Sequence, residues 1–306
     1  MSSAAPRIAL APEPGPEWLA AAIEAGGGEI VPLPECEAII WADAHDPEGL
    51  AAALAVAPQA EWVQLPFAGV ENFLPHLDRR RRWTCGKGVY AGPVAELALT
   101  LGLAGLRGLG TYARATSWSG PRGHGLVGGN VTIIGGGGIA EALVGLLQSF
   151  DCRITVVRRN VEHMDGVDTV LDADQLAHGL PGADLVVLAL ALTEETDGLI
   201  GRDELALMEP HAWIVNVARG RHIVTEDLVD ALRSGTIGGA GLEVTDPEPL
   251  PDDHPLWTMP NCIITPHTGT TPEMGRPLLA ARVEANVRRF AEGAELLGPV
   301  DVEAGY

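Results

Sequence analysis

Polar side chains with catalytic potential follow several apolar segments that are predicted to be strands. Thr193 follows DLVVLAL, Arg219 follows WIVNV, Glu248 follows AGLEV and His267 follows CIIT. In an open parallel sheet, ligands bind beyond the carboxyl ends of the strands, so we expect these side chains at one edge. A guanidinium can hold a carboxylate and polarise a ketone, and an imidazole can protonate a developing alkoxide. Arg219 and His267 are therefore candidates for substrate binding and proton transfer.

The stretch VTIIGGGGIAEAL places four consecutive glycines between a predicted strand and a predicted helix. Gly135, Gly137 and Ala140 fit the pattern GxGxxG/A. The first glycine permits a tight turn, the second lets the backbone approach a pyrophosphate, and the small third residue lets helix and strand pack closely. A diphosphate would then lie at the helix N-terminus, near Gly138 and Ile139, where free N–H groups favour negative charge. Simple helix–strand packing is the alternative explanation.

The next predicted strand, RITVV, is followed by Arg158 and Arg159. A site for NAD places Asp or Glu at this position, where the carboxylate binds the ribose 2′-hydroxyl. A carboxylate would repel a 2′-phosphate, whereas guanidinium groups bind phosphate in bidentate fashion. The arginine pair therefore predicts NADP(H), with NAD still possible, and a solvated basic loop is the alternative.

The composition argues against several classes of partner. A chain of 306 residues with a net charge of −21 repels phosphate backbones and anionic membranes, so neither nucleic acid nor membrane is expected as a partner. The start, MSSAAPRIAL, lacks the features of a signal peptide, and the most apolar stretch, Ala91 to Leu106, is too short to cross a membrane. The four cysteines are widely spaced, which indicates a reducing compartment and no structural zinc. We expect a cytoplasmic protein without a metal site.

Two series of alternating strands and helices indicate two α/β domains. We predict one domain from residues 1–91 and 272–306, and a dinucleotide-binding domain with a doubly wound parallel sheet from residues 92–271. The helix predicted from Gly92 to Leu109 is apolar nearly all round, so it is either a central core helix or a subunit interface. The final helix, from Pro272 to Gly293, is expected to pack on the first domain.

Five short motifs occur in order along the chain. They are PFAGVENF at 66–73, NVARG at 216–220, GAGLEVTDPEPL at 239–250, HPLW at 254–257 and TPH at 265–267. Their order and spacing resemble those of the D-isomer-specific 2-hydroxyacid dehydrogenases, and the arginine pair resembles the glyoxylate/hydroxypyruvate reductase branch. The resemblance extends over nearly the whole chain. It implies a Rossmann cofactor domain and a smaller, discontinuous, flavodoxin-like substrate domain.

The resemblance also implies the roles of individual residues. Arg219 would hold the substrate carboxylate, His267 would donate the proton, and Glu248 would hydrogen-bond His267 and fix its tautomer. Backbone N–H groups of the substrate domain would complete the carboxylate pocket. The implied substrate-binding residues are Ala68, Gly69, Val70, Arg219 and His267. Besides the glycine-rich turn and the arginine pair, the implied cofactor-binding residues are Leu190, Thr196, Val217, Ala218, Glu243 and His267.

Two residues depart from the family's pattern. Glu243 stands where Asp is usual near the nicotinamide carboxamide, and Ala191 stands where proline is common. The resemblance implies a homodimer that reduces a small 2-oxo acid, glyoxylate or hydroxypyruvate, with NADP(H). A dinucleotide-sensing binding protein, similar to the C-terminal-binding corepressors, is the alternative. Each proposed catalytic residue also has a structural alternative: a strand cap or ion-pair partner for Arg219, a solvated loop residue for Glu248 and a structural histidine for His267.

Overall fold

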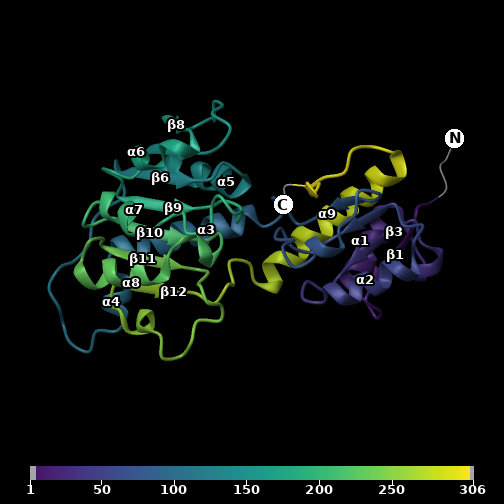
Figure 1. The fold of residues 1–306 in the computed structure, drawn as a ribbon, viewed down its shortest axis with the longest axis horizontal. Helices are drawn as coiled ribbons and strands as arrows, with labels where there is room; N and C mark the ends of the chain where they lie inside the picture. Colours follow the sequence, from purple (N-terminus) through teal and green to yellow (C-terminus); the bar gives the residue numbers. More distant parts are fainter. Residues whose placement is uncertain (1–4, 304–306) are drawn as a thin grey trace. The chain divides into compact units, whose positions relative to one another are not determined.

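The computed structural model of the protein describes residues 5–303. The ends of the predicted substrate domain, residues 1–4 and 304–306, lie outside the described residues. The chain divides into two compact units, one from Met1–Tyr90 with Thr270–Tyr306 and one from Ala91–Gly269 (Figure 1).

The first unit contains a five-stranded parallel sheet with the order β2-β1-β3-β4-β5, which is the order of flavodoxin-like folds. Side chains on a strand alternate between its two faces. On β1, Ile8 and Leu10 accordingly pack with α1 and α9, whereas Ala9 and Ala11 pack with α2. The elements are β1(Arg7–Ala11), α1(Glu17–Ala25), β2(Glu29–Ile30), η1(Leu33–Glu35), β3(Ala38–Trp41), α2(Pro47–Val56), β4(Trp62–Gln64), η2(Leu74–His76), β5(Arg82–Thr84) and α9(Pro272–Glu292).

The second unit contains a seven-stranded parallel sheet with the order β12-β11-β10-β9-β6-β7-β8 (Figure 1). Counted from β8, this is the doubly wound 3-2-1-4-5-6 order with one strand added. The direction of winding reverses between β6 and β9, and ligands bind at such a switch point, beyond the carboxyl ends of the strands. The strands are β6(Asn130–Ile134), β7(Arg153–Val157), β8(Thr169–Leu171), β9(Leu185–Leu188), β10(Trp213–Asn216), β11(Gly239–Leu242) and β12(Cys262–Ile264). The predicted α/β class is therefore confirmed for both sheets.

Helices cover both faces of the larger sheet. One core lies under α3 and α5, and a second lies under α6, α7 and α8. Two glycines let α3 lie directly on the strands, because a Cβ on Gly102 would lie 2.8 Å from Leu185, and one on Gly105 would lie 2.1 Å from the Trp213 ring. The helices are α3(Ala91–Leu106), α4(Leu109–Ala113), α5(Gly138–Leu147), η3(Gln148–Phe150), η4(Ala173–Gln175), α6(Leu176–Gly179), α7(Arg202–Leu207), η5(Gly220–His222), α8(Thr225–Ser234) and η6(Pro255–Thr258).

The structure corrects two details of the predicted elements and agrees with a third. The predicted helix from Gly92 to Leu109 ends at Leu106, because Gly108 has φ +65° and a new helix, α4, begins after it. The strands β2, β5 and β8 were not predicted, since they are short and β2 and β5 carry charged residues. The final helix ends where it was predicted to end, at Gly293, whose φ of +68° is left-handed.

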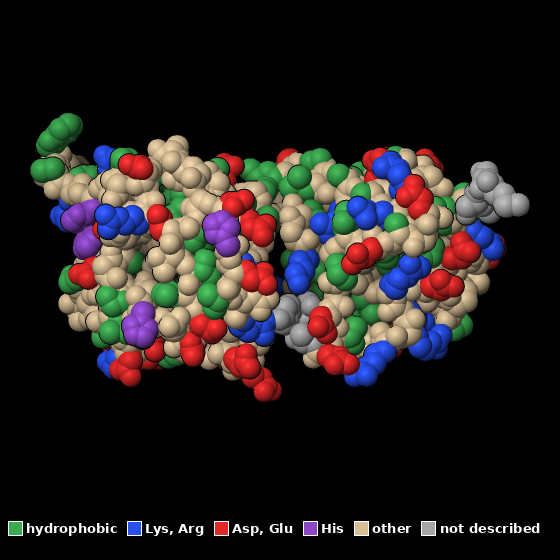
Figure 2. Space-filling view, turned by 90° about the horizontal axis from the view of Figure 1, so that it is seen from above, with side chains coloured by type: hydrophobic (Ala, Val, Ile, Leu, Met, Phe, Trp, Pro, Cys, Tyr) green, Lys and Arg blue, Asp and Glu red, His purple; other side chains and the backbone are tan. Residues whose placement is uncertain are grey.

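The surface carries both charge types. On the face shown in Figure 2, acidic and basic side chains are interspersed on each unit, so the excess of acidic residues does not form one continuous patch there. Among residues 5–303, no helix combines the length and the hydropathy needed to cross a membrane.

Candidate active site

The glycine-rich turn joins β6 to α5 at the switch point of the sheet. Gly135 has φ +115°, and a Cβ there would lie 2.2 Å from the carbonyl oxygen of Ala189 in the neighbouring loop. A Cβ on Gly137 would meet no atom within 4 Å, so the space above this glycine is open. Ala140 is fully buried against the sheet. The turn thus has a left-handed first glycine, an open second position and a packed third residue, as a dinucleotide-binding turn requires.

The N-terminus of α5 begins at Gly138, and Gly137 is its N-cap. The first N–H groups of a helix have no intrahelical partner and point toward the space in front of it. Here that space lies beside the open Gly137. Gly138 and Ile139 therefore present backbone donors at a position suited to an anion.

Arg158 and Arg159 follow β7, the strand next to β6. A Cβ on Gly136 would lie 2.7 Å from both Cδ and Nε of Arg158, so this arginine side chain crosses directly over the glycine-rich turn. The guanidinium is thereby held next to the switch point. A side chain at 136 would require the Arg158 side chain to move away from the turn.

The loop after β9 contains Leu190 and is closed by Thr196. The Thr196 hydroxyl accepts a hydrogen bond from the N–H of Thr193 (2.8 Å) and donates to the carbonyl of Ala191 (2.9 Å). The alanine at 191 thus supplies a carbonyl that anchors the loop. Thr196, which was predicted to bind the cofactor, organises the loop after the strand at the switch point.

The loop after β10 carries Arg219. The buried Asn216 shapes it, because its Oδ1 accepts from the N–H of Ala218 (3.0 Å) and its Nδ2 donates to the carbonyl of Arg219 (2.8 Å). Val217 and Ala218 are also buried, and Nη1 of Arg219 donates to the Ala218 carbonyl (2.7 Å). The strand end therefore turns sharply at the residue whose side chain was predicted to bind substrate.

The Arg219 loop touches the loop that follows β11. A Cβ on Gly220 would lie 1.9 Å from the carbonyl oxygen of Thr245, so only glycine permits the two backbones to approach this closely. The N–H of Thr245 in turn donates to Oε2 of Glu248 (3.4 Å). Arg219 and Glu248 are thus on adjoining loops at the same edge of the sheet.

Glu248 and His267 are brought together across two strand ends. Oε1 of Glu248 lies 2.6 Å from Nδ1 of His267, and the two side chains are 42% and 51% exposed. The carboxylate accepts from Nδ1, which orients the ring and leaves Nε2 available to a ligand. His267 itself has φ +53°, a left-handed conformation that is rare for a residue other than glycine.

Glu243 holds the loop that carries His267. Its buried carboxylate accepts hydrogen bonds from the hydroxyl of Thr265 and from the N–H of Gly269, and its carbonyl accepts from the N–H of His267 (2.9 Å). Both ends and the middle of the segment 265–269 are therefore tied to one residue. A contact between this carboxylate and the nicotinamide carboxamide, as predicted, would have to share an oxygen with one of these donors.

His222 was not among the predicted site residues, although it is connected to two of them. Its fully buried ring lies 3.2 Å from the N–H of Arg219 and 3.2 Å from the carbonyl of Ala191. Burial lowers the pKa of His222. The only sequence signal for it is a histidine one turn after the arginine at a strand end, which does not by itself indicate the link to Ala191.

In the first unit, the predicted substrate loop follows β4. Ala68 is exposed, Gly69 is partly exposed and Val70 is buried. The loop is fastened at its start, where Tyr90 donates its hydroxyl proton to the Pro66 carbonyl (2.8 Å), and burial raises the pKa of Tyr90 to about 12. Among the described residues, no protein acceptor pairs with the N–H of Gly69 or of Val70.

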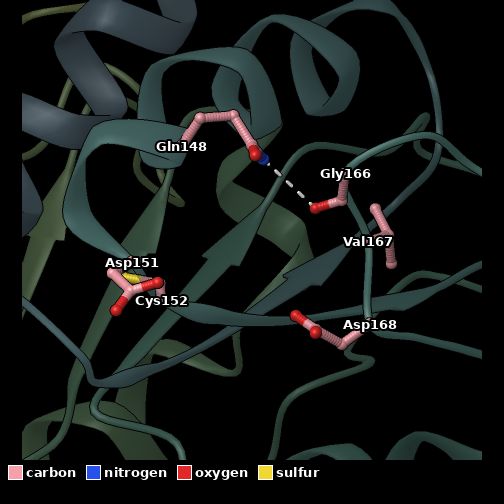
Figure 3. Close-up of a pocket in the computed structure, with 6 residues that line it drawn as sticks. All are labelled: Gln148, Asp151, Cys152, Gly166, Val167 and Asp168. Atoms are coloured by element: carbon pink, nitrogen blue, oxygen red, sulfur yellow. Dashed lines mark hydrogen bonds between the residues drawn. The ribbon is translucent and has the colours of Figure 1, made fainter.

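A separate pocket in the second unit is lined by Gln148, Asp151, Cys152, Gly166, Val167 and Asp168 (Figure 3). Asp151 and Cys152 immediately precede β7, and Asp168 immediately precedes β8. The pocket therefore lies at the amino ends of the strands, opposite the edge that carries Arg219, Glu248 and His267. It does not belong to the candidate active site.

Comparisons with known proteins agree with this architecture. The family model of the D-isomer specific 2-hydroxyacid dehydrogenase NAD binding domain matches residues 98–269. The chain is 39% identical over 80% of its length to an uncharacterized protein in the proB 3′ region of Corynebacterium melassecola, and covers 84% of that protein. It is 34% identical over 58% of its length to glyoxylate/hydroxypyruvate reductase A of Serratia proteamaculans, of which the match spans 56%.

Two solved structures are similar over nearly the entire chain. One is a D-isomer specific 2-hydroxyacid dehydrogenase from Xanthobacter autotrophicus Py2 in complex with NADPH and MES, with a TM-score of 0.84, 26% identity and coverage of 99% of this chain and 100% of that one. The other is the NADPH-dependent glyoxylate/hydroxypyruvate reductase of Sinorhizobium meliloti, with a TM-score of 0.80, 25% identity and coverage of 98% and 100%. The chain belongs to the D-isomer specific 2-hydroxyacid dehydrogenase family. It is therefore an oxidoreductase with a Rossmann domain for a nicotinamide dinucleotide.

Proposed function

We propose that the protein reduces a small 2-oxo acid, glyoxylate or hydroxypyruvate, to the corresponding D-2-hydroxy acid with NADPH. The observation that carries the proposal is the Glu248–His267 pair, which lies beside the Arg219 loop at the carboxyl edge of a Rossmann sheet. The similarity to glyoxylate/hydroxypyruvate reductases, one of them NADPH-dependent, supports the choice of substrate and cofactor.

Each side chain has one task in this reaction. Arg219 binds the substrate carboxylate and polarises the ketone. His267 donates a proton from Nε2 to the developing alkoxide, while Glu248 holds the ring through Nδ1. NADPH, when bound, would supply the hydride for this reduction.

The residues around the glycine-rich turn fit a dinucleotide. The open space at Gly137 and the free N–H groups of Gly138 and Ile139 suit the pyrophosphate. Arg158 and Arg159 follow the strand whose end lies near the adenosine ribose, where they would bind a 2′-phosphate. Leu190, Thr196, Val217, Ala218, Glu243 and His267 would line the remainder of the cofactor site.

A spectrophotometric assay at 340 nm tests the function directly. The purified chain is mixed with a panel of 2-oxo acids that includes glyoxylate, hydroxypyruvate and pyruvate, with NADPH or NADH. We expect turnover with at least one of the first two acids and a preference for NADPH. Absence of turnover with every acid and either cofactor would contradict the proposal and favour a dinucleotide-sensing binding protein.

Removal of the arginine pair tests the cofactor assignment. In the Arg158→Ala/Arg159→Ala double variant, KM for NADPH should rise at least about tenfold, because each lost hydrogen bond to a charged group costs about 1.5–3 kcal/mol. KM for NADH should change little, since NADH has no 2′-phosphate. Equal effects on both cofactors would reject the assignment.

The protein is further proposed to act as a cytoplasmic homodimer. Its four thiols are all free, as expected in a reducing compartment. The segment after α3 exposes several large apolar side chains, namely Leu109 (54%), Trp118 (101%) and Val127 (75%), and exposed apolar groups commonly mark protein interfaces. Light scattering coupled to size-exclusion chromatography should give twice the chain mass, and a Trp118→Glu/Val127→Glu variant should shift the protein toward the monomer.

A further inference from the structure

His222 joins two loops of the second unit through its ring. It lies at the end of η5, and its side chain is completely buried. The N–H of Arg219 donates to Nδ1 (3.2 Å), and Nε2 lies 3.2 Å from the carbonyl oxygen of Ala191. The first contact holds the loop after β10, and the second holds the loop after β9.

These partners select one form of the ring. The N–H of Arg219 is a donor, so Nδ1 must present a lone pair, and the carbonyl of Ala191 is an acceptor, so Nε2 must carry the proton. The carbonyl of Arg219 also lies 3.0 Å from Nδ1, but it already accepts from Nδ2 of Asn216 (2.8 Å) and from the N–H of His222 (3.2 Å). The neutral imidazole with its proton on Nε2 therefore satisfies both loops.

The surroundings of His222 include groups that raise its pKa and groups that lower it. Burial and the nearby Arg219 guanidinium lower the pKa of His222, whereas the backbone contacts with Ala191 and Arg219 and the Asp197 carboxylate raise it. Burial is the largest of these influences, so the net shift is downward. Asp197 is itself paired with Arg221.

The carbonyl of Ala191 connects His222 with the loop predicted to bind cofactor. The same oxygen accepts the hydroxyl of Thr196 (2.9 Å), which also fixes the N–H of Thr193. A continuous chain of hydrogen bonds therefore runs from Thr196 through Ala191 and His222 to the backbone of Arg219. Displacement of either loop would break a hydrogen bond of the buried His222 ring and leave a buried polar group without a partner, which costs free energy.

From this chain of bonds, we infer that His222 is a positioning residue that sets the Arg219 backbone against the cofactor loop. The inference rests on the proposed function of Arg219 as the group that binds the substrate carboxylate. His222 acts through Arg219, because both of its ring nitrogens are engaged by backbone groups and neither is available to substrate. A displaced Arg219 would bind the 2-oxo acid less well.

Three substitutions separate the two ring contacts. In His222→Asn, the amide oxygen can replace Nδ1 as the acceptor for the N–H of Arg219. In His222→Gln, the amide nitrogen can replace Nε2 as the donor to the carbonyl of Ala191. His222→Leu replaces neither contact. For His222→Leu we expect KM for the 2-oxo acid to rise about tenfold, with KM for NADPH unchanged. His222→Asn should return KM for the acid to within about threefold of the unsubstituted enzyme, and His222→Gln should remain closer to His222→Leu.

The kinetic outcomes decide the inference. An unchanged KM for the acid in His222→Leu, an equal rise for acid and cofactor, or a His222→Asn variant no better than His222→Leu would each overturn it. Melting temperatures of all three variants show whether folding is retained. A loss of melting temperature with unchanged KM would assign His222 a purely structural role and would likewise overturn the inference.

A measurement on the unsubstituted protein keeps the test independent of activity. In protein labelled with 15N-histidine, the ring signals of His222, assigned by their loss in His222→Asn, should report the Nε2–H tautomer at pH 8, where the imidazole is neutral. A neutral ring with its proton on Nδ1 would overturn the inference. If no 2-oxo acid is reduced by the unsubstituted protein, the proposed function fails, while the NMR result still tests the bridge between Ala191 and Arg219.

Discussion

Two histidines at the same edge of the larger sheet have opposite environments. His267 is half exposed, and only its Nδ1 is engaged, by the Glu248 carboxylate at 2.6 Å. His222 is fully buried, and both of its nitrogens are engaged by backbone groups of Arg219 and Ala191. One ring has a nitrogen available to transfer a proton, whereas the other can only hold its neighbours.

The contrast shows that the residue type alone does not define a catalytic histidine. Proton transfer requires an accessible nitrogen and a partner that orients the ring. Positioning requires the reverse, namely a ring whose nitrogens are all occupied within a buried site.

The largest effect is expected at His267. His267→Ala should lower kcat at least about a hundredfold, because general acid catalysis contributes about 10² to 10⁴ in rate, while KM for NADPH stays nearly unchanged. Steady-state kinetics at saturating cofactor measure both. His211→Ala is a matched control, since His211 forms a similar pair with Asp184 (2.7 Å) at the opposite edge of the sheet. Retained turnover in His267→Ala would mean that another group donates the proton.

A smaller effect is expected at Glu248. Glu248→Gln keeps a polar group beside Nδ1 of His267 but removes its charge, and hydrogen bonds to charged groups contribute about 1.5–3 kcal/mol. We expect kcat to fall about tenfold in Glu248→Gln and further in Glu248→Ala. Identical kinetics for Glu248→Gln and the unsubstituted enzyme would make Glu248 a loop residue without a role in orienting His267.

Glu243 is a buried residue that supports the half-exposed His267. Its carboxylate accepts hydrogen bonds from both ends of the segment that carries this histidine. Glu243→Gln cannot accept from both Thr265 and Gly269 in the same way, so His267 should lose its orientation and kcat should fall about tenfold. KM for NADPH separates the explanations. An unchanged KM supports the loop role, whereas a large rise with NADPH and NADH alike would support the contact with the nicotinamide carboxamide.

The smallest effect concerns stability at low pH. Since the pKa of His222 is lowered in the folded protein, the unfolded chain takes up a proton near its ordinary pKa of about 6.5, whereas the folded chain takes it up only at a lower pH. This favours the unfolded state increasingly as pH falls below that value. His222→Gln has no such group, so its melting temperature should fall less between pH 7.5 and pH 5.5. Parallel decreases for both proteins would indicate that His222 titrates normally in the folded state.

Much of the larger unit was predictable from local patterns. The turn from β6 to α5 was recognisable because Gly135, Gly137 and Ala140 form a GxGxxA pattern directly between a predicted strand and a predicted helix. The strand ends placed Arg219, Glu248 and His267 at one edge, since all strands of the sheet are parallel. The short strands β5 and β8 escaped prediction because their pairing with β4 and β7 does not depend on a strong apolar pattern of their own.

The sequence by itself determined the two α/β sheets, the glycine-rich turn and the order of the polar strand ends, because these depend on periodicity and on conformations available to single residues. Only the tertiary structure decided which histidine is buried, which carbonyl its ring meets, and that Glu243 closes the segment around His267. These features depend on hydrogen bonds between residues far apart in the chain. Such bonds form only when the loops at neighbouring strand ends pack together and exclude water.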